Sequence, residues 1–295
     1  MNPRPTQEEA SIQALPAFVE SRRIGQATVT IISEGSLLWA PEFQVADAEW
    51  RRALPEATAR GAIWLGINVA HVQMDAAALL IDPGFDDPSA QRAGPPAWPA
   101  LTRSPGLAAG LASIGVRPEQ ITHVLITHTH DDHFAGVTME RDGERVARFP
   151  RARHLVGRRD WDDNPHRTQP GSALTIHLGT LERLGLLTVV DRECEVVPGV
   201  TVIPTPGESP GHAMARVHSA GESFYYVGDL FHHPCEVEHL DWVSPGRDRA
   251  AVRASRERLV AAAVAERAIV VFTHARFPAW GHIMPAGAGY RWERA

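Results

Sequence analysis

The sequence has no lysine, since all 29 of its basic residues are arginine. Without a lysine amine, the chain cannot form a catalytic Schiff base, bind pyridoxal phosphate covalently, or supply the lysine of a phosphate-binding P-loop. Its only two cysteines, Cys194 and Cys235, exclude a disulfide scaffold, a cysteine-ligated zinc site and an iron–sulfur cluster. These absences remove several large classes of enzyme and structural protein.

Long apolar runs and basic tracts are also absent. No stretch approaches the ~20 apolar residues of a membrane span, and the N-terminal residues lack the apolar core of a signal peptide. The formal net charge is −6, and nucleic-acid binding needs concentrated positive charge. We therefore expect a soluble, cytoplasmic protein with no nucleic-acid or membrane partner, and we leave open whether it is a homo-oligomer.

The apolar segments predict a layered α/β domain. Helical spacing is clearest at residues 106–115, 172–187 and 247–267, and strand-like segments stand on both sides of these helices. Two groups of strands with helices around them favour two packed sheets covered on the outside. With no internal linker, we expect an N-terminal arm at residues 1–25 and one domain at residues 26–295. A short helix is expected at residues 47–53, and strands at residues 26–33, 68–74, 76–82, 121–127, 153–157, 187–191, 200–205, 213–218, 223–227 and 268–273.

Residues 85–105 are rich in proline and glycine and show no periodicity. A loop this long in a compact domain is usually functional, so we expect it to cover a site and to influence the range of substrates. Phe85, Trp98 and Trp280 are candidates for the apolar wall of a pocket.

The 15 histidines are unevenly placed, and three of them lie between His128 and His133 directly after an apolar strand. In an extended chain, residues two apart point the same way, so His128 and His130 can share one metal ion. Asp132 and His133 follow where the chain turns and can face a second ion. Imidazole and carboxylate are the ligands expected for Zn, Mn or Fe.

This His-x-His-x-Asp-His motif resembles the signature of the metallo-β-lactamase superfamily. Further segments are similar to family motifs in the same order: residues 80–84, 205–212, 227–229 and 272–274. The resemblance covers residues 26–295 and implies an αββα four-layer sandwich. Residues 231–234 and 274–282 look closest to a branch related to methyl parathion hydrolase and the acyl-homoserine lactonases.

The resemblance also implies a dinuclear metal site and a hydrolytic activity. Two divalent ions, zinc in the family, would hold a bridging hydroxide that attacks an ester, lactone or related bond of a small molecule. Asp132 and Asp229 are the carboxylates assigned to catalysis. The implied ligands are His128, His130 and Glu208 for the first ion, Asp132, His133 and His274 for the second, and Asp229 between them.

Glu208 departs from the family pattern, which has a histidine at this position and a second histidine matching His212. Glu208 can bind the metal, His212 can replace it, or the first site can be weak or empty. If Glu208 binds, then Asp132, Glu208, Asp229 and a hydroxide balance two divalent ions. Such a neutral site would favour Mn or Fe(II) over Zn and would acidify bound water less.

Other residues near these motifs are weaker candidates for a role in catalysis or metal binding. Residues 207–211 match the Gly-x-Ser-x-Gly elbow of serine hydrolases, but Pro210 has no N–H for an oxyanion hole and a strand is expected next. We expect Asp82 to anchor hydrogen bonds rather than bind metal. His282 could be a neighbour of the site or a rival ligand, but a structural role is favoured. His232 and His233 could line the pocket or could stand in a polar turn, and both alternatives remain open. We expect Asp131 to be a neighbour of the site.

Two other classes of function remain as alternatives. One is an oxidative enzyme with a single iron, whose usual two-histidine, one-carboxylate face fits Glu208 poorly. The other is a non-catalytic binding protein in which Glu208 has weakened the metal site. Metal content with oxygen consumption would identify the first, and any hydrolytic turnover would exclude the second.

Overall fold

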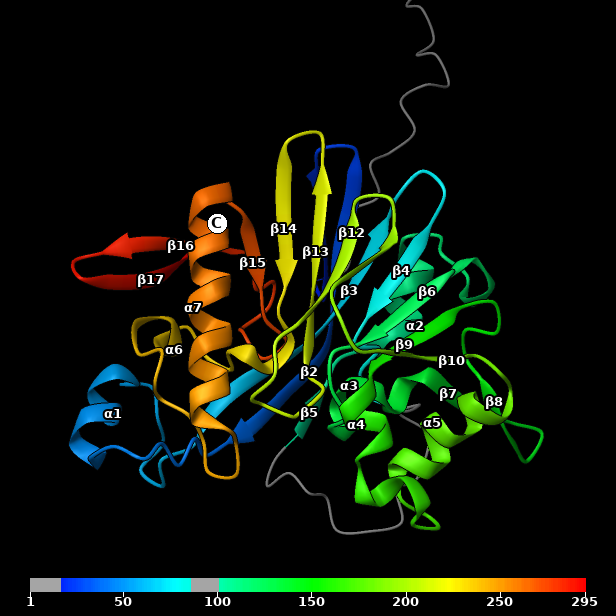
Figure 1. The fold of residues 1–295 in the computed structure, drawn as a ribbon, viewed down its shortest axis with the longest axis horizontal. Coiled ribbons are helices and arrows are strands. Elements are labelled where there is room, and N and C mark those ends of the chain that lie inside the picture. Colours follow the sequence, from blue (N-terminus) through cyan, green and yellow to red (C-terminus); the bar gives the residue numbers. More distant parts are fainter. Residues whose placement is uncertain (1–16, 86–100) are drawn as a thin grey trace, which may run out of the picture.

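Two mixed β-sheets lie face to face with helices outside them in the computed structural model, which describes residues 17–85 and 101–295 (Figure 1). The expected αββα arrangement is confirmed. The first sheet has the order β1-β2-β3-β4-β6-β9-β10, with β5 paired to β2, and the second runs β11-β12-β13-β14-β15-β16-β17. The first contains β1 (Val19–Ile24), β2 (Ala27–Trp39), β3 (Ile63–Gln73), β4 (Ala78–Ile81), β5 (Leu101–Arg103), β6 (His123–Ile126), β9 (Arg153–Gly157) and β10 (Leu187–Val190). The second contains β11 (Cys194–Val197), β12 (Val200–Pro204), β13 (Ala213–Ser219), β14 (Glu222–Tyr226), β15 (Ile269–Val271), β16 (Gly281–Ala286) and β17 (Gly289–Arg294).

The central strands of the first sheet are apolar on both faces because both faces are covered. Leu79 on β4 and Leu125 on β6 belong to the core between the sheets. Their neighbours Leu80 and Val124 point the other way and pack in the cluster that contains the helical Leu111. Strands buried on both sides read as continuous apolar runs, which is why these strands are clear in the sequence.

Helices form the two outer layers, and α7 and α5 lie on opposite sides of the molecule in Figure 1. Leu259 and Val260 of α7 join the same core as Phe224 of the second sheet. Asp248 caps α7 by accepting the N–H of Ala251 at 3.1 Å. The helices are α1 (Asp47–Ala53), α2 (Gly106–Ser113), α3 (Asp131–Phe134), α4 (Arg158–Asp162), α5 (Ala173–Arg183), α6 (Cys235–Glu238) and α7 (Arg249–Glu266), and a separate hairpin joins β7 (Thr138–Arg141) to β8 (Glu144–Ala147).

Both ends of the domain differ from the expectation. Val19–Ile24 is strand β1, paired antiparallel with β2, so the boundary expected at residue 25 is wrong for these residues. The expected arm at residues 1–16 lies outside the described residues. At the other end, the β16–β17 hairpin extends the second sheet beyond the last strand expected from the sequence.

One edge of the sandwich collects the ends of several strands. Strands β4, β6 and β9 are parallel in the first sheet, as are β14 and β15 in the second. Strand β12 runs in the same direction as β14, because each is antiparallel to β13. The loops that leave the carboxyl ends of these strands therefore meet at a single edge.

Glu34, a buried carboxylate on β2, holds two distant points of the chain. It accepts the N–H of Phe85 at 2.7 Å and that of Leu107 at 2.9 Å. These residues stand on either side of residues 86–100, which lie outside the described residues. Most of the expected cover loop, including Trp98, falls within that range. Glu34 thus fixes both ends of the connection to the sandwich.

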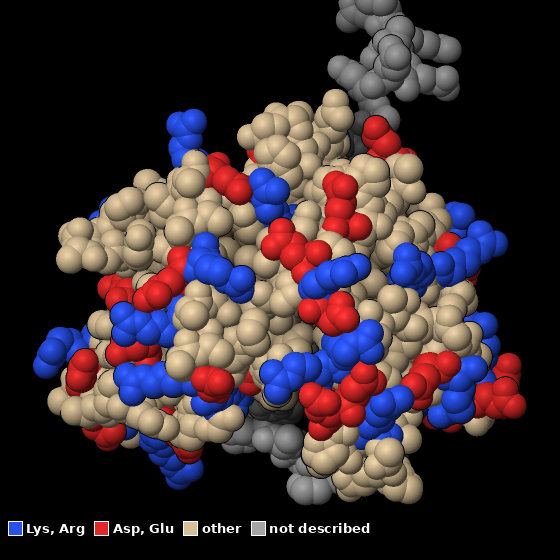
Figure 2. All heavy atoms as spheres, viewed as in Figure 1, with Lys and Arg blue, Asp and Glu red and all other residues tan. Residues whose placement is uncertain are grey.

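On the face of the molecule shown in Figure 2, arginine and acidic side chains are interspersed. Among the described residues, no helix has the length and apolar character needed to cross a membrane.

Candidate metal centre

The expected ligands come together at the edge where the strands end. His128 and His130 follow β6, Glu208 lies in the loop after β12, and Asp229 and His274 follow β14 and β15. Four segments that are remote in sequence therefore supply a single site. Two groups of possible metal ligands form within it, His128, His130, Glu208 and Asp229 in one and Asp132, His133 and His274 in the other.

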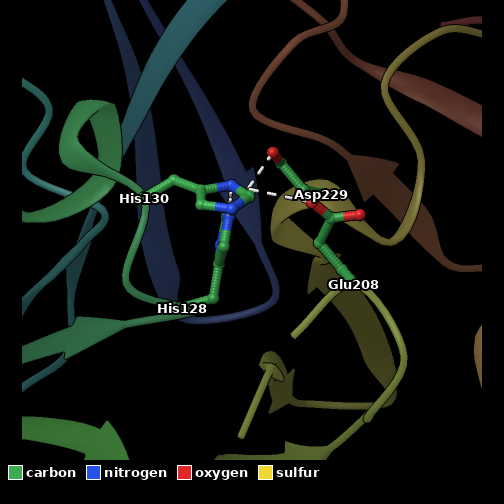
Figure 3. Close-up of side chains that lie close together, drawn as sticks. All are labelled: His128, His130, Glu208 and Asp229. Carbon is green, nitrogen blue, oxygen red and sulfur yellow. Dashed lines mark hydrogen bonds and ion pairs between the residues drawn. The ribbon is translucent and has the colours of Figure 1, made fainter. Parts of the chain in front are cut away.

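The first cluster joins two imidazoles to two carboxylates (Figure 3). His128 Nε2 lies 2.8 Å from His130 Nδ1 and 3.6 Å from Asp229 Oδ2. His130 Nδ1 is 3.6 Å from Glu208 Oε1. His128 is fully buried, whereas the side chain of His130 is 43% exposed, so the cluster opens to solvent beside His130.

The second cluster is buried and shares Asp229 with the first. His133 Nε2 and His274 Nε2 lie 3.7 and 3.5 Å from Asp132 Oδ2. Both also approach Asp229 Oδ1, at 3.4 and 3.3 Å. The two oxygens of Asp229 thus face different clusters, as a bridging carboxylate requires.

These donor sets fit divalent ions. Asp132 Oδ2, His133 Nε2 and Asp229 Oδ1 are buried without a hydrogen-bond partner among the described residues, which folded proteins rarely tolerate. Ligands at ~2.0–2.1 Å from a tetrahedral zinc ion lie about 3.3 Å from one another. The separations of 3.3–3.7 Å in the second cluster are close to that value.

The electrostatics of the second cluster also favour a cation. Burial alone would lower the pKa of His133, but the carboxylates of Asp229, Asp132 and Asp82 raise it well above its ordinary value. Burial would raise the pKa of Asp229, yet the surrounding histidines, His133 first, hold it well below the usual range. The carboxylates are thus arranged to stabilise positive charge, which a metal ion supplies more effectively than a proton.

Asp82 and Gly66 orient the ligands from behind. Asp82 accepts the N–H and the hydroxyl of Thr127, each at 2.8 Å, and its Oδ2 lies 2.8 Å from His133 Nδ1. The carbonyl of Gly66 is 2.8 Å from His274 Nδ1. Each contact directs the opposite ring nitrogen toward the cluster, as outer hydrogen bonds do for metal-bound histidines. Asp82 has the anchoring position that the sequence predicts.

Glu208 lies in the first cluster and His212 does not. Both nitrogens of His212 are engaged, Nδ1 with Thr205 Oγ1 at 2.8 Å and Nε2 with the N–H of Asp229 at 3.2 Å. Glu208 Oε1 faces His130 but also contacts Arg247, whose Nη2 lies at 2.6 Å. Arg247 adds a positive charge beside the first cluster that the charge count from the sequence did not include.

Asp160 is a residue of the site that sequence analysis missed. This buried carboxylate on α4 accepts the N–H of Gly211 and the hydroxyl of Ser209, each at 2.6 Å, and the N–H of Thr129 at 3.3 Å. It ties the loop carrying Glu208 to the loop carrying His130. No motif marks it, because it stands among other acidic residues on a short helix. Ser209 is engaged by this contact, and strand β13 follows, which agrees with excluding a serine nucleophile.

His232 lies closer to the site than the sequence indicates. Its ring stacks on His274 at 5.6 Å and on Trp39 at 5.0 Å, and its Nε2 is 3.4 Å from Asp229 Oδ2. Burial opposes protonation, but Asp229 and Glu236 raise the pKa of His232 to about 10. His232 is thus a cationic neighbour of the shared carboxylate.

Several other candidate residues make contacts outside the two clusters. His282 is on β16, where its Nδ1 is 2.9 Å from the carbonyl of Ala268, so it is no rival ligand. Phe85 and Trp280 are buried in hydrophobic clusters rather than lining a cavity, so their expected role in a pocket wall is wrong. Asp131 begins α3 with an exposed side chain. His233 pairs with Glu56 at 3.0 Å and lines the cavity that His274 also lines, which fits the pocket alternative.

Fold and site together define an αββα protein with a candidate dinuclear metal centre at the edge of its sheets. Residues 62–274 match the family described as the metallo-beta-lactamase superfamily, and the chain belongs to that superfamily.

Individual relatives are distant. An N-acyl homoserine lactonase from Bacillus cereus is 23% identical over 176 residues, which are 60% of this chain and 64% of that protein. The match therefore spans slightly less than two thirds of that relative. AidC, a dizinc quorum-quenching lactonase solved with a product, aligns with a TM-score of 0.73 at 20% identity, covering 94% of this chain and 97% of AidC. AbOPH, a hydrolase of the beta lactamase superfamily, aligns with a TM-score of 0.78 at 20% identity, covering 96% and 99%. These structural likenesses show the fold.

Proposed function

We propose that this protein is a dinuclear metal-dependent hydrolase that opens a lactone, or cleaves a related ester, in a small molecule. N-acyl homoserine lactones are the first substrates to test, because a relative and a structural neighbour act as lactonases. Zinc is the proposed metal, since imidazole and carboxylate donors at the separations of the second cluster suit it. A cytoplasmic location belongs to the same proposal.

The shared position of Asp229 carries the proposal. One oxygen faces His128 at 3.6 Å, and the other faces His133 and His274 at 3.4 and 3.3 Å. A carboxylate aimed at two ligand clusters is the arrangement that holds two ions side by side. Two such ions, when bound, supply a bridging hydroxide at neutral pH and polarise the carbonyl group of a substrate.

The side chains supply positioning rather than a nucleophile. His133 and His274 are oriented by Asp82 and by the Gly66 carbonyl. Cys235 is buried, and burial raises the pKa of its thiol, so a thiolate nucleophile is disfavoured. Hydrolysis of a lactone adds water across the acyl C–O bond and gives a hydroxy acid, which releases a proton at neutral pH.

A cavity of about 540 Å³ adjoins the site at His274. Its lining includes Trp64, Leu65 and Trp292, together with the polar His233 and Arg276. An apolar wall beside a metal centre suits a substrate that carries an acyl or aromatic group next to the scissile bond.

The test combines metal content with turnover. Protein purified without chelators should contain about two divalent ions per chain and should open lactones, measured as proton release with a pH indicator. Asp229→Asn should lose turnover and at least one ion, whereas Asp241→Asn, at an exposed acid, should change neither.

The alternatives have different signatures. Oxygen consumption with one iron and no hydrolysis would indicate the oxidative enzyme. Two bound ions without turnover on any ester or lactone would favour the binding protein, and a chain that cannot be loaded with metal would refute the proposal.

A further inference from the structure

Arg247, which stands two residues before α7, makes its main contact with Glu208. Its Nε donates to Glu208 Oε1 at 2.8 Å and its Nη2 approaches the same oxygen at 2.6 Å. The Glu208 side chain is 3% exposed and that of Arg247 27% exposed, so water screens this pair only partly.

The oxygen that Arg247 contacts is also the one that faces the first cluster. Glu208 Oε1 lies 3.6 Å from His130 Nδ1, and two nitrogens of the Arg247 guanidinium, Nε and Nη2, contact that same oxygen. An ion at this cluster must share Oε1 with the guanidinium, or Glu208 must rotate to offer its other oxygen. In either case the ion also meets a fixed positive charge at close range.

The two clusters differ in what metal binding must displace. In the first, His128 and His130 hydrogen-bond to each other, and Glu208 pairs with Arg247. In the second, the buried atoms of Asp132 and His133 have no hydrogen-bond partner among the described residues. No described arginine forms an ion pair with Asp132 or Asp229, and His232 approaches Asp229 at Oδ2, the oxygen that faces the first cluster. Loading the first site therefore breaks contacts of hydrogen-bond length, whereas the second site offers buried atoms that meet one another only at 3.3–3.7 Å.

We propose that Arg247 makes the two metal sites unequal, so that the ion at His128, His130 and Glu208 is the labile one. Arg247 is a positioning residue that lowers the affinity of the first site, by competing for Glu208 and by repelling the ion. The inference rests on the dinuclear site proposed above.

Two effects of removing Arg247 oppose each other. Loss of the guanidinium frees Glu208 Oε1 and removes a positive charge, which strengthens metal binding. It also removes a contact that orients Glu208, but this side chain is almost fully buried and packing confines it. The electrostatic effect therefore dominates, and we expect the first ion to bind about tenfold more tightly, the equivalent of ~1.4 kcal/mol.

Stepwise chelation of the full-length dizinc protein tests the proposal. Elemental analysis should show one zinc lost well before the other, and anomalous diffraction from the one-zinc form should show the second cluster occupied. Arg247→Gln should shift the first loss to about tenfold higher chelator concentration. Arg247→Lys, which keeps the charge, should leave the first ion labile. Arg249→Gln is the matched control, because Arg249 is exposed and pairs with Asp241 rather than with a ligand.

The outcomes separate this inference from the proposed function. Simultaneous loss of both ions, earlier loss from the second cluster, or an Arg247→Gln variant that holds the first ion no more tightly would overturn the role of Arg247 while leaving a dinuclear hydrolase intact. A protein that binds zinc at neither cluster would instead refute the proposed function.

Discussion

Acid should destabilise this fold through two histidines far from the metal centre. His71 on β3 and His154 on β9 lie in one row across the first sheet, connected through Leu80 and Val124. Both are buried on the face that packs against α2 and α5, and burial lowers the pKa of each to about 4. Neither ring nitrogen of His71 has a hydrogen-bond partner among the described residues.

These pKa values determine the sign and the size of the effect on the free energy of unfolding. Each imidazole stays neutral in the folded state but takes a proton near pH 6.5 once unfolded. The stability that depends on these two neutral histidines is therefore fully present above pH 6.5 and is lost as the pH falls toward 4. By pH 5 each histidine should reduce the free energy of unfolding by about 2 kcal/mol. Together they remove about 4 kcal/mol, a large part of the 5–15 kcal/mol typical of a folded domain.

Urea unfolding at pH 7.5 and pH 5.0 would measure this loss. The metal-free protein should be used, because ligand protonation also releases metal in acid. Replacing both residues, His71→Leu with His154→Leu, should reduce the difference between the two pH values by about 4 kcal/mol. His166→Leu, at an exposed histidine, should not reduce it. An equal acid sensitivity in the wild type and the double variant would show that these histidines are not its source.

The site supports further tests. Glu208→Gln should weaken the first metal at least tenfold in a chelator titration, whereas His212→Ala should leave two ions bound; the reverse pattern would make His212 the ligand. Glu208→His should move the acidic limb of the pH–rate profile to lower pH, because a site with one carboxylate fewer acidifies its water more. His128→Ala with His130→Ala should empty the first site before the second in elemental analysis. Asp160→Ala should lower the free energy of unfolding by about 2–4 kcal/mol in urea, since it leaves buried donors unpaired.

The central strands and the ligands were predictable because their signals are local. A strand buried on both faces reads as an apolar run, and the dense group from His128 to His133 follows directly from such a strand. His274 was found in the same way, at the end of β15. Strand β1 and the β16–β17 hairpin were missed because they lie at the sheet edges, where charged residues such as the half-buried Arg22 and the exposed Arg294 are compatible with a strand.

The residues that modify the site were not predictable. Arg247 and Asp160 act on the loop of Glu208 from 39 and 48 positions away along the chain, and nothing in their own surroundings marks them. Trp280 was misplaced for a related reason, because closeness to His274 in sequence does not decide which way a side chain faces. Contacts of this kind depend on how the two sheets pack, which no local pattern encodes.

Glu34 joins two segments that are distant in sequence through a single buried carboxylate. Since it accepts the N–H groups of Phe85 and Leu107, one residue of β2 holds both the stretch after β4 and the first turn of α2. A buried backbone donor left without an acceptor costs about 1–3 kcal/mol. A descendant of this protein that loses Glu34 must therefore supply another acceptor at this point, which makes the position hard to vary over evolutionary time.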